Sequence, residues 1–165
     1  MPRRGVVYTV APSYKELNTI WAGTDDGLVQ VTTDGGAHWT DVTPPQLVPW
    51  AKVSILEASH SDPQTAYAAI NTLRLDDLTP YIYRTRDGGH SWRALEWAMN
   101  RYRYVQAVAF HPSVPGTAYV RTAQALLTTT DRGDRFSELL GAPALTVSDR
   151  GLRWGLLTDR FGKAR

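Results

Sequence analysis

The sequence predicts an all-β protein, a partial β-propeller of about three four-stranded antiparallel blades. Three observations lead to this prediction. A turn-forming string occurs three times, a second repeated string precedes each occurrence, and short β-branched and aromatic runs lie between them, bounded by Gly, Pro, Asn and Asp. No segment keeps a helical spacing of apolar residues over three turns. Four short strands in every unit of about 40 to 50 residues are typical of a propeller blade.

The repeated turn reads TTDGGAHW at residues 32–39, TRDGGHSW at 85–92 and TTDRGDRF at 129–136. We expect its glycine to supply the positive φ of a tight hairpin between the third and fourth strands of each unit. The Asp is expected to accept hydrogen bonds from backbone N–H groups of the turn, and the aromatic residue to pack beneath it. The residues with these structural roles are Thr32, Asp34, Gly36 and Trp39, then Thr85, Asp87, Gly89 and Trp92, then Thr129, Asp131, Gly133 and Phe136.

A second string recurs upstream of each turn, as NTIWAG from Asn18, QTAYAA from Gln64 and GTAYVR from Gly116. From its Thr to the Asp of the following turn the chain advances 15, 22 and 14 residues in the three units. The middle unit therefore carries additional residues, in NTLRLDDLTP. We interpret the pattern as one repeated supersecondary unit with a loop insertion.

Each unit contains four predicted strands. They cover residues 5–10, 19–23, 28–33 and 38–43 in the first unit, 52–59, 65–70, 81–86 and 91–96 in the second, and 105–110, 117–122, 125–130 and 135–140 in the third. The expected divisions are blades at 1–48, 49–100 and 101–142, with a degenerate partial blade or tail at 143–165. Propellers typically have four to eight blades, so three blades alone would expose apolar faces at both ends. Three hypotheses follow: a piece of a longer propeller, a homo-oligomer that completes a ring, or capping by the tail.

Composition excludes several classes of site and partner. Hydrophobic residues make up 42% and charged residues 21%, as in globular proteins. The net charge of +2 comes from scattered basic residues, so we expect no nucleic-acid or membrane partner. The sequence has no cysteine, each repeated turn offers a single acid where a Ca²⁺ loop needs several ligands, and the four histidines follow the repeat, so neither a metal nor a cofactor is expected. The N-terminal MPRRGVVYTV lacks the apolar region of a signal peptide, and the compartment is left open.

The spacing Ser/Thr-x-Asp-x-Gly-x-x-Trp/Phe of the repeated turn resembles the Asp-box, or BNR repeat, of sialidases, xyloglucanase-like glycoside hydrolases and the sortilin ectodomain. TIWAGTDDGLVQVTTDGGAHWTDVTPP and YIYRTRDGGHSW are most similar to large bacterial BNR-repeat proteins described as glycosyl hydrolase-like or sortilin-like. The resemblance covers residues from about 6 to 140, and Arg135 and Phe136 depart from the usual pair in the third box. It implies a propeller, exported relatives and a structural, non-catalytic box. The Arg-Ile-Pro motif of sialidases is absent, which disfavours sialidase activity.

The ligand site of such a propeller is expected on the loop face opposite the repeated turns. Four acids on these loops are candidate catalytic residues, because glycoside hydrolysis uses two carboxylates about 5 to 9.5 Å apart: Asp25, Asp26, Asp76 and Asp77. Their neighbours are candidate ligand contacts: Trp50, Arg74, Glu96, Trp97, Arg101, Tyr102 and Tyr104. Structural interpretations are also open, since Asp-Asp-Gly is a common hairpin turn, Arg-Leu-Asp-Asp can form a surface ion pair and the tryptophans can pack between blades.

The sequence leaves two functional hypotheses. The first is a non-catalytic, sortilin-like binding module that recognises a protein or a glycan on its loop face. The second is part of a xyloglucanase-like glycoside hydrolase that uses Asp25 or Asp26 with Asp76 or Asp77. A structural fragment of a longer propeller is a third possibility. Opposed carboxylates around a groove would favour the hydrolase, and acids spread into solvent would favour the binding module.

Overall fold

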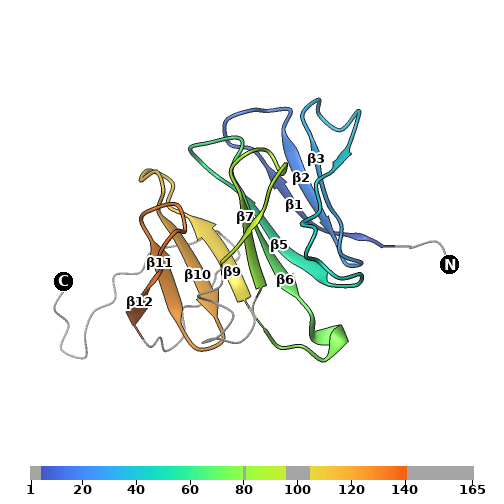
Figure 1. Cartoon of the computed structure of the whole chain (residues 1–165). Helices are drawn as coiled ribbons and strands as arrows, with labels where there is room; N and C mark the ends of the chain where they lie inside the picture. The colour runs from blue at the N-terminus through green and yellow to red at the C-terminus, as the bar shows by residue number, and fades with distance from the viewer. Residues whose placement is uncertain (1–4, 80, 96–104, 141–165) are drawn as a thin grey trace.

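The computed structural model describes residues 5–79, 81–95 and 105–140, which form three four-stranded antiparallel sheets (Figure 1). The first sheet contains β1 (Val7–Pro12), β2 (Ile20–Thr24), β3 (Val29–Thr32) and β4 (Thr40–Asp41). The second contains β5 (Lys52–Ala58), β6 (Ala66–Asn71), β7 (Tyr81–Thr85) and β8 (Arg93–Ala94). The third contains β9 (Val105–Phe110), β10 (Ala118–Thr122), β11 (Leu126–Thr129) and β12 (Ser137–Leu140). Strands pair in chain order, which confirms the predicted all-β class.

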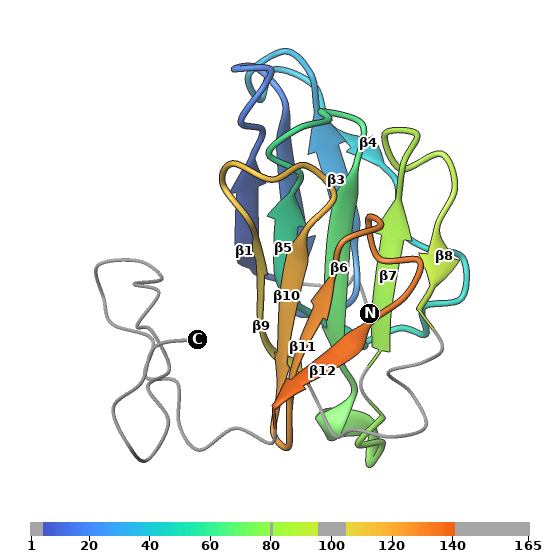
Figure 2. The ribbon, with the colours of Figure 1, turned by 90° about the vertical axis from the view of Figure 1, so that its left-hand side faces the viewer.

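The three sheets, called blades 1, 2 and 3 below, pack side by side through their faces (Figures 1 and 2). Strand β5 contacts both β1 and β2, and β9 contacts both β5 and β6. The first strand of a blade therefore packs against the first two strands of the preceding blade. Blade 2 is covered on both faces, whereas each outer blade is covered on one face by another described blade.

Two hydrophobic clusters fill the spaces between neighbouring blades. On β6, Ala66, Ala68 and Ile70 belong to the cluster shared with blade 1, whereas Tyr67 and Ala69 belong to the cluster shared with blade 3. This division follows from the strand itself, because successive side chains point to opposite faces. Since both faces of blade 2 are covered, β6 has an almost continuous apolar sequence in place of alternating apolar and polar residues.

The additional residues of the middle unit form the connection from β6 to β7. This connection contains a short 3-10 helix, η1 (Leu73–Leu75), at the opposite end of blade 2 from the β7–β8 turn (Figures 1 and 2). Strands β4 and β8 are shorter than predicted, with two residues each, and short edge strands limit the unpaired N–H and C=O groups that a blade exposes. In the part of the chain that the structure describes, no helix is long and apolar enough to cross a membrane.

Candidate functional site

The three repeated turns share one hydrogen-bond pattern. In the first turn, Thr32 Oγ1 donates to Asp34 Oδ1 at 2.8 Å and accepts from the N–H of Gly36 at 2.9 Å, and Asp34 Oδ1 accepts from the N–H of His38 at 2.9 Å. The same three distances are 2.8, 2.9 and 2.9 Å in the second turn and 2.7, 2.9 and 2.9 Å in the third. The Asp of each turn is thus used to satisfy backbone groups within that turn.

These bonds keep the turn carboxylates ionised. Hydrogen bonds from His38 hold the pKa of Asp34 far below its usual range. Burial alone would raise the pKa of Asp87, but hydrogen bonds from the Ser91 side chain and N–H lower it to about 2. A carboxyl group with so low a pKa is a poor proton donor at neutral pH.

Each turn contains two consecutive residues with positive φ. The angles are 74° and 100° at Gly35 and Gly36, 70° and 92° at Gly88 and Gly89, and 61° and 85° at Arg132 and Gly133. Arg132 therefore takes a conformation that costs a non-glycine residue roughly 1–2 kcal/mol. Its carbonyl oxygen, turned toward blade 2, accepts hydrogen bonds from Tyr67 Oη and Arg84 Nη1, and these contacts help to offset that cost.

One turn aromatic, Trp92, also packs on the preceding blade, a contact that the prediction did not include. Its Nε1–H donates to the carbonyl oxygen of Val42 at 2.6 Å, and its ring meets the Trp21 ring edge to face, with centroids 6.1 Å apart. A Cβ added to Gly89 would lie 2.6 Å from Val42 Cβ, so the turn backbone also abuts blade 1. The equivalent Trp39 is exposed, because no described blade covers that face of blade 1.

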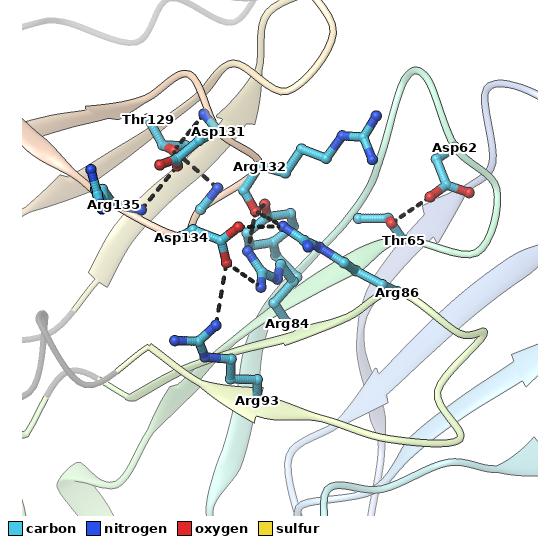
Figure 3. A network of polar contacts seen from close by, with 12 residues as sticks. Asp62, Thr65, Arg84, Arg86, Arg93, Thr129, Asp131, Arg132, Asp134 and Arg135 are labelled. Atoms are coloured by element: carbon cyan, nitrogen blue, oxygen red, sulfur yellow. Dashed lines mark hydrogen bonds and ion pairs between the residues drawn. The ribbon is translucent and has the colours of Figure 1, made fainter.

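An ion cluster that the sequence analysis missed joins blades 2 and 3 (Figure 3). The Asp134 carboxylate pairs with Arg84 Nη2 at 2.8 Å, Arg86 Nη2 at 3.0 Å and Arg93 Nη1 at 3.3 Å. Hydrogen bonds from Arg84 and then from Arg86, together with the charges of both arginines, hold the pKa of Asp134 below its usual range despite some desolvation. Two features of the sequence could have indicated this cluster. Arg84 lies in strand β7 and Arg86 directly follows it, and Asp134 in the third repeated turn has no acidic counterpart in the other two turns.

Asp25 lies in the β2–β3 turn, and the structure brings it together with Arg74. Its Oδ1 accepts from the N–H of Val6 at 2.8 Å, and its Oδ2 pairs with Arg74 Nη1 at 3.3 Å. The Val6 N–H is the largest cause that lowers the pKa of Asp25, and Arg74 adds to it. The ion pair links the β2–β3 turn to the η1 loop.

Asp26 differs from the surface position expected for it. Its side chain is buried, and its Oδ1 accepts from Thr24 Oγ1 at 2.5 Å. Its carbonyl oxygen accepts from the N–H of Trp50 at 2.9 Å, which ties the β4–β5 loop to the β2–β3 turn. The short side chain of Asp26 lets it fold back onto its own turn, as expected of an Asx residue before a glycine.

Asp76 and Asp77 follow η1 and serve that loop. Asp76 has a φ of 57° and its N–H donates to the carbonyl oxygen of Leu73. Asp77 Oδ1 accepts from the N–H of Thr79 at 2.9 Å, and its Oδ2 accepts from Tyr81 Oη at 2.7 Å. Hydrogen bonds from Thr79 are the largest cause of the lowered pKa of Asp77.

Exposed apolar side chains lie on the β4–β5 loop and on the η1 loop, both of which contact the β2–β3 turn that carries Asp25. We call them the loop-face patch: Val48, Trp50, Leu73, Leu75 and Leu78. A Cβ added to Gly27 would lie 3.0 Å from the Ala51 carbonyl oxygen and 3.4 Å from that of Val48, so the β4–β5 loop closes over the β2–β3 turn. The η1 loop reaches the same turn through Arg74.

The remaining predicted ligand contacts lie outside the described residues. They are Glu96, Trp97, Arg101, Tyr102 and Tyr104. Within residues 5–79, 81–95 and 105–140, no group of three His, Asp or Glu side chains is placed to hold a metal ion.

Sequence analysis also missed Glu57, an acid that follows the apolar pair Ile55 and Leu56 in strand β5. Burial raises the pKa of Glu57 to about 7. His60 Nε2 lies 3.6 Å from Glu57 Oε1, and burial lowers the pKa of His60. The Tyr14 ring contacts the His60 ring in a tilted arrangement, with a centroid distance of 3.8 Å and an interplanar angle of 47°. A single acid within an apolar run was the available signal, because such a residue is costly to bury.

Comparisons with known proteins agree with this architecture. No protein-family model and no curated protein sequence matches the chain. A YCF48 structure with a bound D1 peptide aligns with a TM-score of 0.63 and 17% identity over 84% of this chain and 42% of that chain. YCF48 from Cyanidioschyzon merolae gives 0.61 and 22%, over 85% of this chain and 38% of that one. The GH74 xyloglucanase from Xanthomonas campestris gives 0.64 and 12%, over 83% and 24%.

The chain folds as a partial β-propeller. At these identities the likeness establishes the fold, and function has to be argued from the residues of the site. The chain spans less than half the length of these propellers.

Proposed function

We propose that this partial propeller is a non-catalytic binding module that recognises a protein segment through the loop-face patch. The observation that carries the proposal is the set of exposed apolar side chains on two loops that both contact the β2–β3 turn, one of them through the Asp25–Arg74 ion pair. Single exposed apolar residues are normal on soluble proteins, but several on adjoining loops beside a charged pair are typical of an interaction site.

Trp50 and Arg74 supply the residue types that dominate binding energies at protein interfaces. Trp50 has a φ of 70°, and its N–H is fixed by the Asp26 carbonyl oxygen. The main chain at Trp50 is thus fixed before a ligand binds, so little backbone entropy is lost on binding.

A peptide ligand is compatible with this fold, since one structural neighbour, YCF48, was solved with a D1 peptide. A glycan is the other ligand class under consideration, and it would stack on the Trp50 ring. We favour the protein segment because aliphatic side chains outnumber aromatic ones in the loop-face patch.

The hydrolase hypothesis has less support from the contacts of its candidate acids. A general acid in a glycosidase needs a raised pKa, whereas the pKa values of Asp25 and Asp77 are lowered. Asp26 is buried against Thr24, where its carboxylate is occupied by the turn. The GH74 neighbours share the fold, and the assay below includes their substrate class.

Displayed random peptides selected on the immobilised full chain test the proposal, with affinities of the enriched peptides measured by fluorescence anisotropy. We expect Trp50→Ser and Arg74→Ser each to weaken binding by about tenfold or more. Arg93→Ser is the matched control, because Arg93 is also an exposed, ion-paired arginine but lies away from the patch. Absence of enriched peptides, or equal losses in all three variants, would contradict the proposal. Xyloglucan cleavage that is lost in Asp77→Asn would instead support the hydrolase.

A further inference from the structure

The joints between blades 1 and 2 and between blades 2 and 3 are built from equivalent positions. The strand register gives the equivalence: Val10 pairs with Ala22, Leu56 with Ala68 and Val108 with Val120. We call the face of a blade that packs on the preceding blade its leading face, and the opposite face its trailing face. In each joint, the leading face of the later blade contributes its first strand and its turn aromatic. The trailing face of the earlier blade contributes its third strand and the residue eight positions after the turn Asp.

The leading face of blade 1 has these features but no described blade against it. Val10 is 55% exposed, whereas the equivalent Leu56 and Val108 are 3% and 8% exposed. Trp39 is 42% exposed, whereas the equivalent Trp92 is 9% exposed. The difference lies in the neighbour, because the turns that carry the two tryptophans have the same hydrogen bonds.

The trailing face of blade 3 has the complementary features. Leu139 follows Asp131 by eight positions, as Val42 follows Asp34 and Leu95 follows Asp87, although a register shift in blade 3 places Leu140 opposite Leu126. Leu139 is 44% exposed, while Val42 and Leu95 are 8% and 3% exposed. Among the described residues, Val10 and Trp39 of one half and Leu139 of the other half of a joint that the chain builds twice internally are therefore exposed.

We propose that two copies of this chain associate head to tail, each placing the leading face of its blade 1 on the trailing face of blade 3 of the other copy. Two such joints close a ring of six blades, within the usual range of four to eight, whereas three copies would give nine. Because the two faces differ, the contact is heterologous and closes only when the rotation completes the ring.

The ion pair of the second joint has no charged counterpart in the third. The positions of the Arg84–Asp134 pair in the second joint are occupied by Thr128 and Ala37 in the third, so no like charges meet there. One residue makes the third joint looser than the others. Arg121 lies where Gly23 and Ala69 lie in blades 1 and 2, and Val53 of blade 2 approaches so closely that a Cβ added to Gly23 would be 2.5 Å from its Cγ1.

Sedimentation velocity of the full chain over a concentration series tests the proposal. We expect a reversible dimer of twice 18.4 kDa, lost in Trp39→Asp and in Leu139→Asp. Trp50→Asp is the matched control, since Trp50 is 44% exposed but lies on the loop face, and it should leave the mass unchanged. Arg121→Ala should lower the dissociation constant by about threefold or more.

Mixing the two defective variants gives the decisive result. The Trp39→Asp copy keeps an intact trailing face and the Leu139→Asp copy an intact leading face, so the mixture regains one joint and forms a heterodimer that neither variant forms alone. A wild-type monomer throughout the series, or a dimer that survives both substitutions, overturns the proposal. Val10→Glu provides a second leading-face variant if Trp39→Asp fails to fold, and it must also be rescued by Leu139→Asp. Because these substitutions lie away from the loop-face patch, failure of dimerisation and failure of peptide binding are distinguishable.

Discussion

Removing the Asp134 carboxylate should destabilise the fold more than removing its buried partner, Arg84. Arg84 is 4% exposed, and in Asp134→Ala its guanidinium loses the one carboxylate with which it pairs among the described residues. Loss of one member of a buried ion pair costs about 3–5 kcal/mol, and the 39% exposure of Asp134 reduces our expectation to about 2 kcal/mol. Arg84→Met removes the buried charge, while Asp134 keeps Arg86 and Arg93, so about 1 kcal/mol or less is expected.

The double variant provides the sharper test. Once Arg84 is replaced by Met, removal of Asp134 no longer strands a buried charge, so the double variant should be more stable than Asp134→Ala alone. Urea unfolding followed by tryptophan fluorescence at pH 7 gives the three free energies, at protein concentrations where self-association is negligible. Arg93→Met, which removes an exposed pair, should change stability by about 0.5 kcal/mol or less. Additive losses in the double variant would refute the reasoning.

Three further outcomes follow from the structure. Trp92→Phe should lower the free energy of unfolding by about 3 kcal/mol, because it removes a buried hydrogen bond and leaves a cavity between blades 1 and 2. Trp39→Phe should lower it by less than about 1 kcal/mol, because Trp39 is exposed. Similar urea midpoints for the two variants would count against this account. Burial raises the pKa of Glu57 from 4.5 to about 7, so its contribution to stability is fully present below about pH 4.5 and is lost as pH rises toward 7. The wild type should therefore lose about 2 kcal/mol of unfolding free energy over this pH range, and Glu57→Gln should not show that loss. Parallel pH profiles of stability for the two proteins would contradict the raised pKa. Arg132→Gly should raise stability by about 0.5–1 kcal/mol and Gly133→Ala should lower it, because both positions have positive φ; calorimetry that finds the opposite order would contradict the turn geometry.

The fold was predictable because its information is local. The eight residues of each repeated turn contain the side chains and backbone groups that close its hairpin. The spacing of the Thr, Asp and Gly matches the hydrogen bonds that the structure contains. Strand positions followed from the short β-branched and aromatic runs between turns. The repeat then made the three blades equivalent without knowledge of any long-range contact.

The contacts between blades were not predictable in the same way. The bond from Trp92 to Val42 joins residues 50 positions apart, and the sequence pattern does not distinguish it from packing within a blade. Asp25 and Arg74 were each identified on loops, but their pairing depends on how blades 1 and 2 are set side by side. Asp26 was expected at the surface because its neighbours are typical of a turn, and the backbone near Gly5 that helps to bury it comes from an earlier part of the chain.

The repeated turn also bears on how such a chain can change in length. Every bond from Thr85 and Asp87 that closes the second turn reaches a residue at most four positions away. A duplicated or transplanted gene segment would therefore carry a complete turn into any new position, while the indole of that segment would still depend on the neighbour it meets there. Blade number in this architecture can vary by whole units at little local cost, and what limits it is whether the first and last units find a surface to pack on.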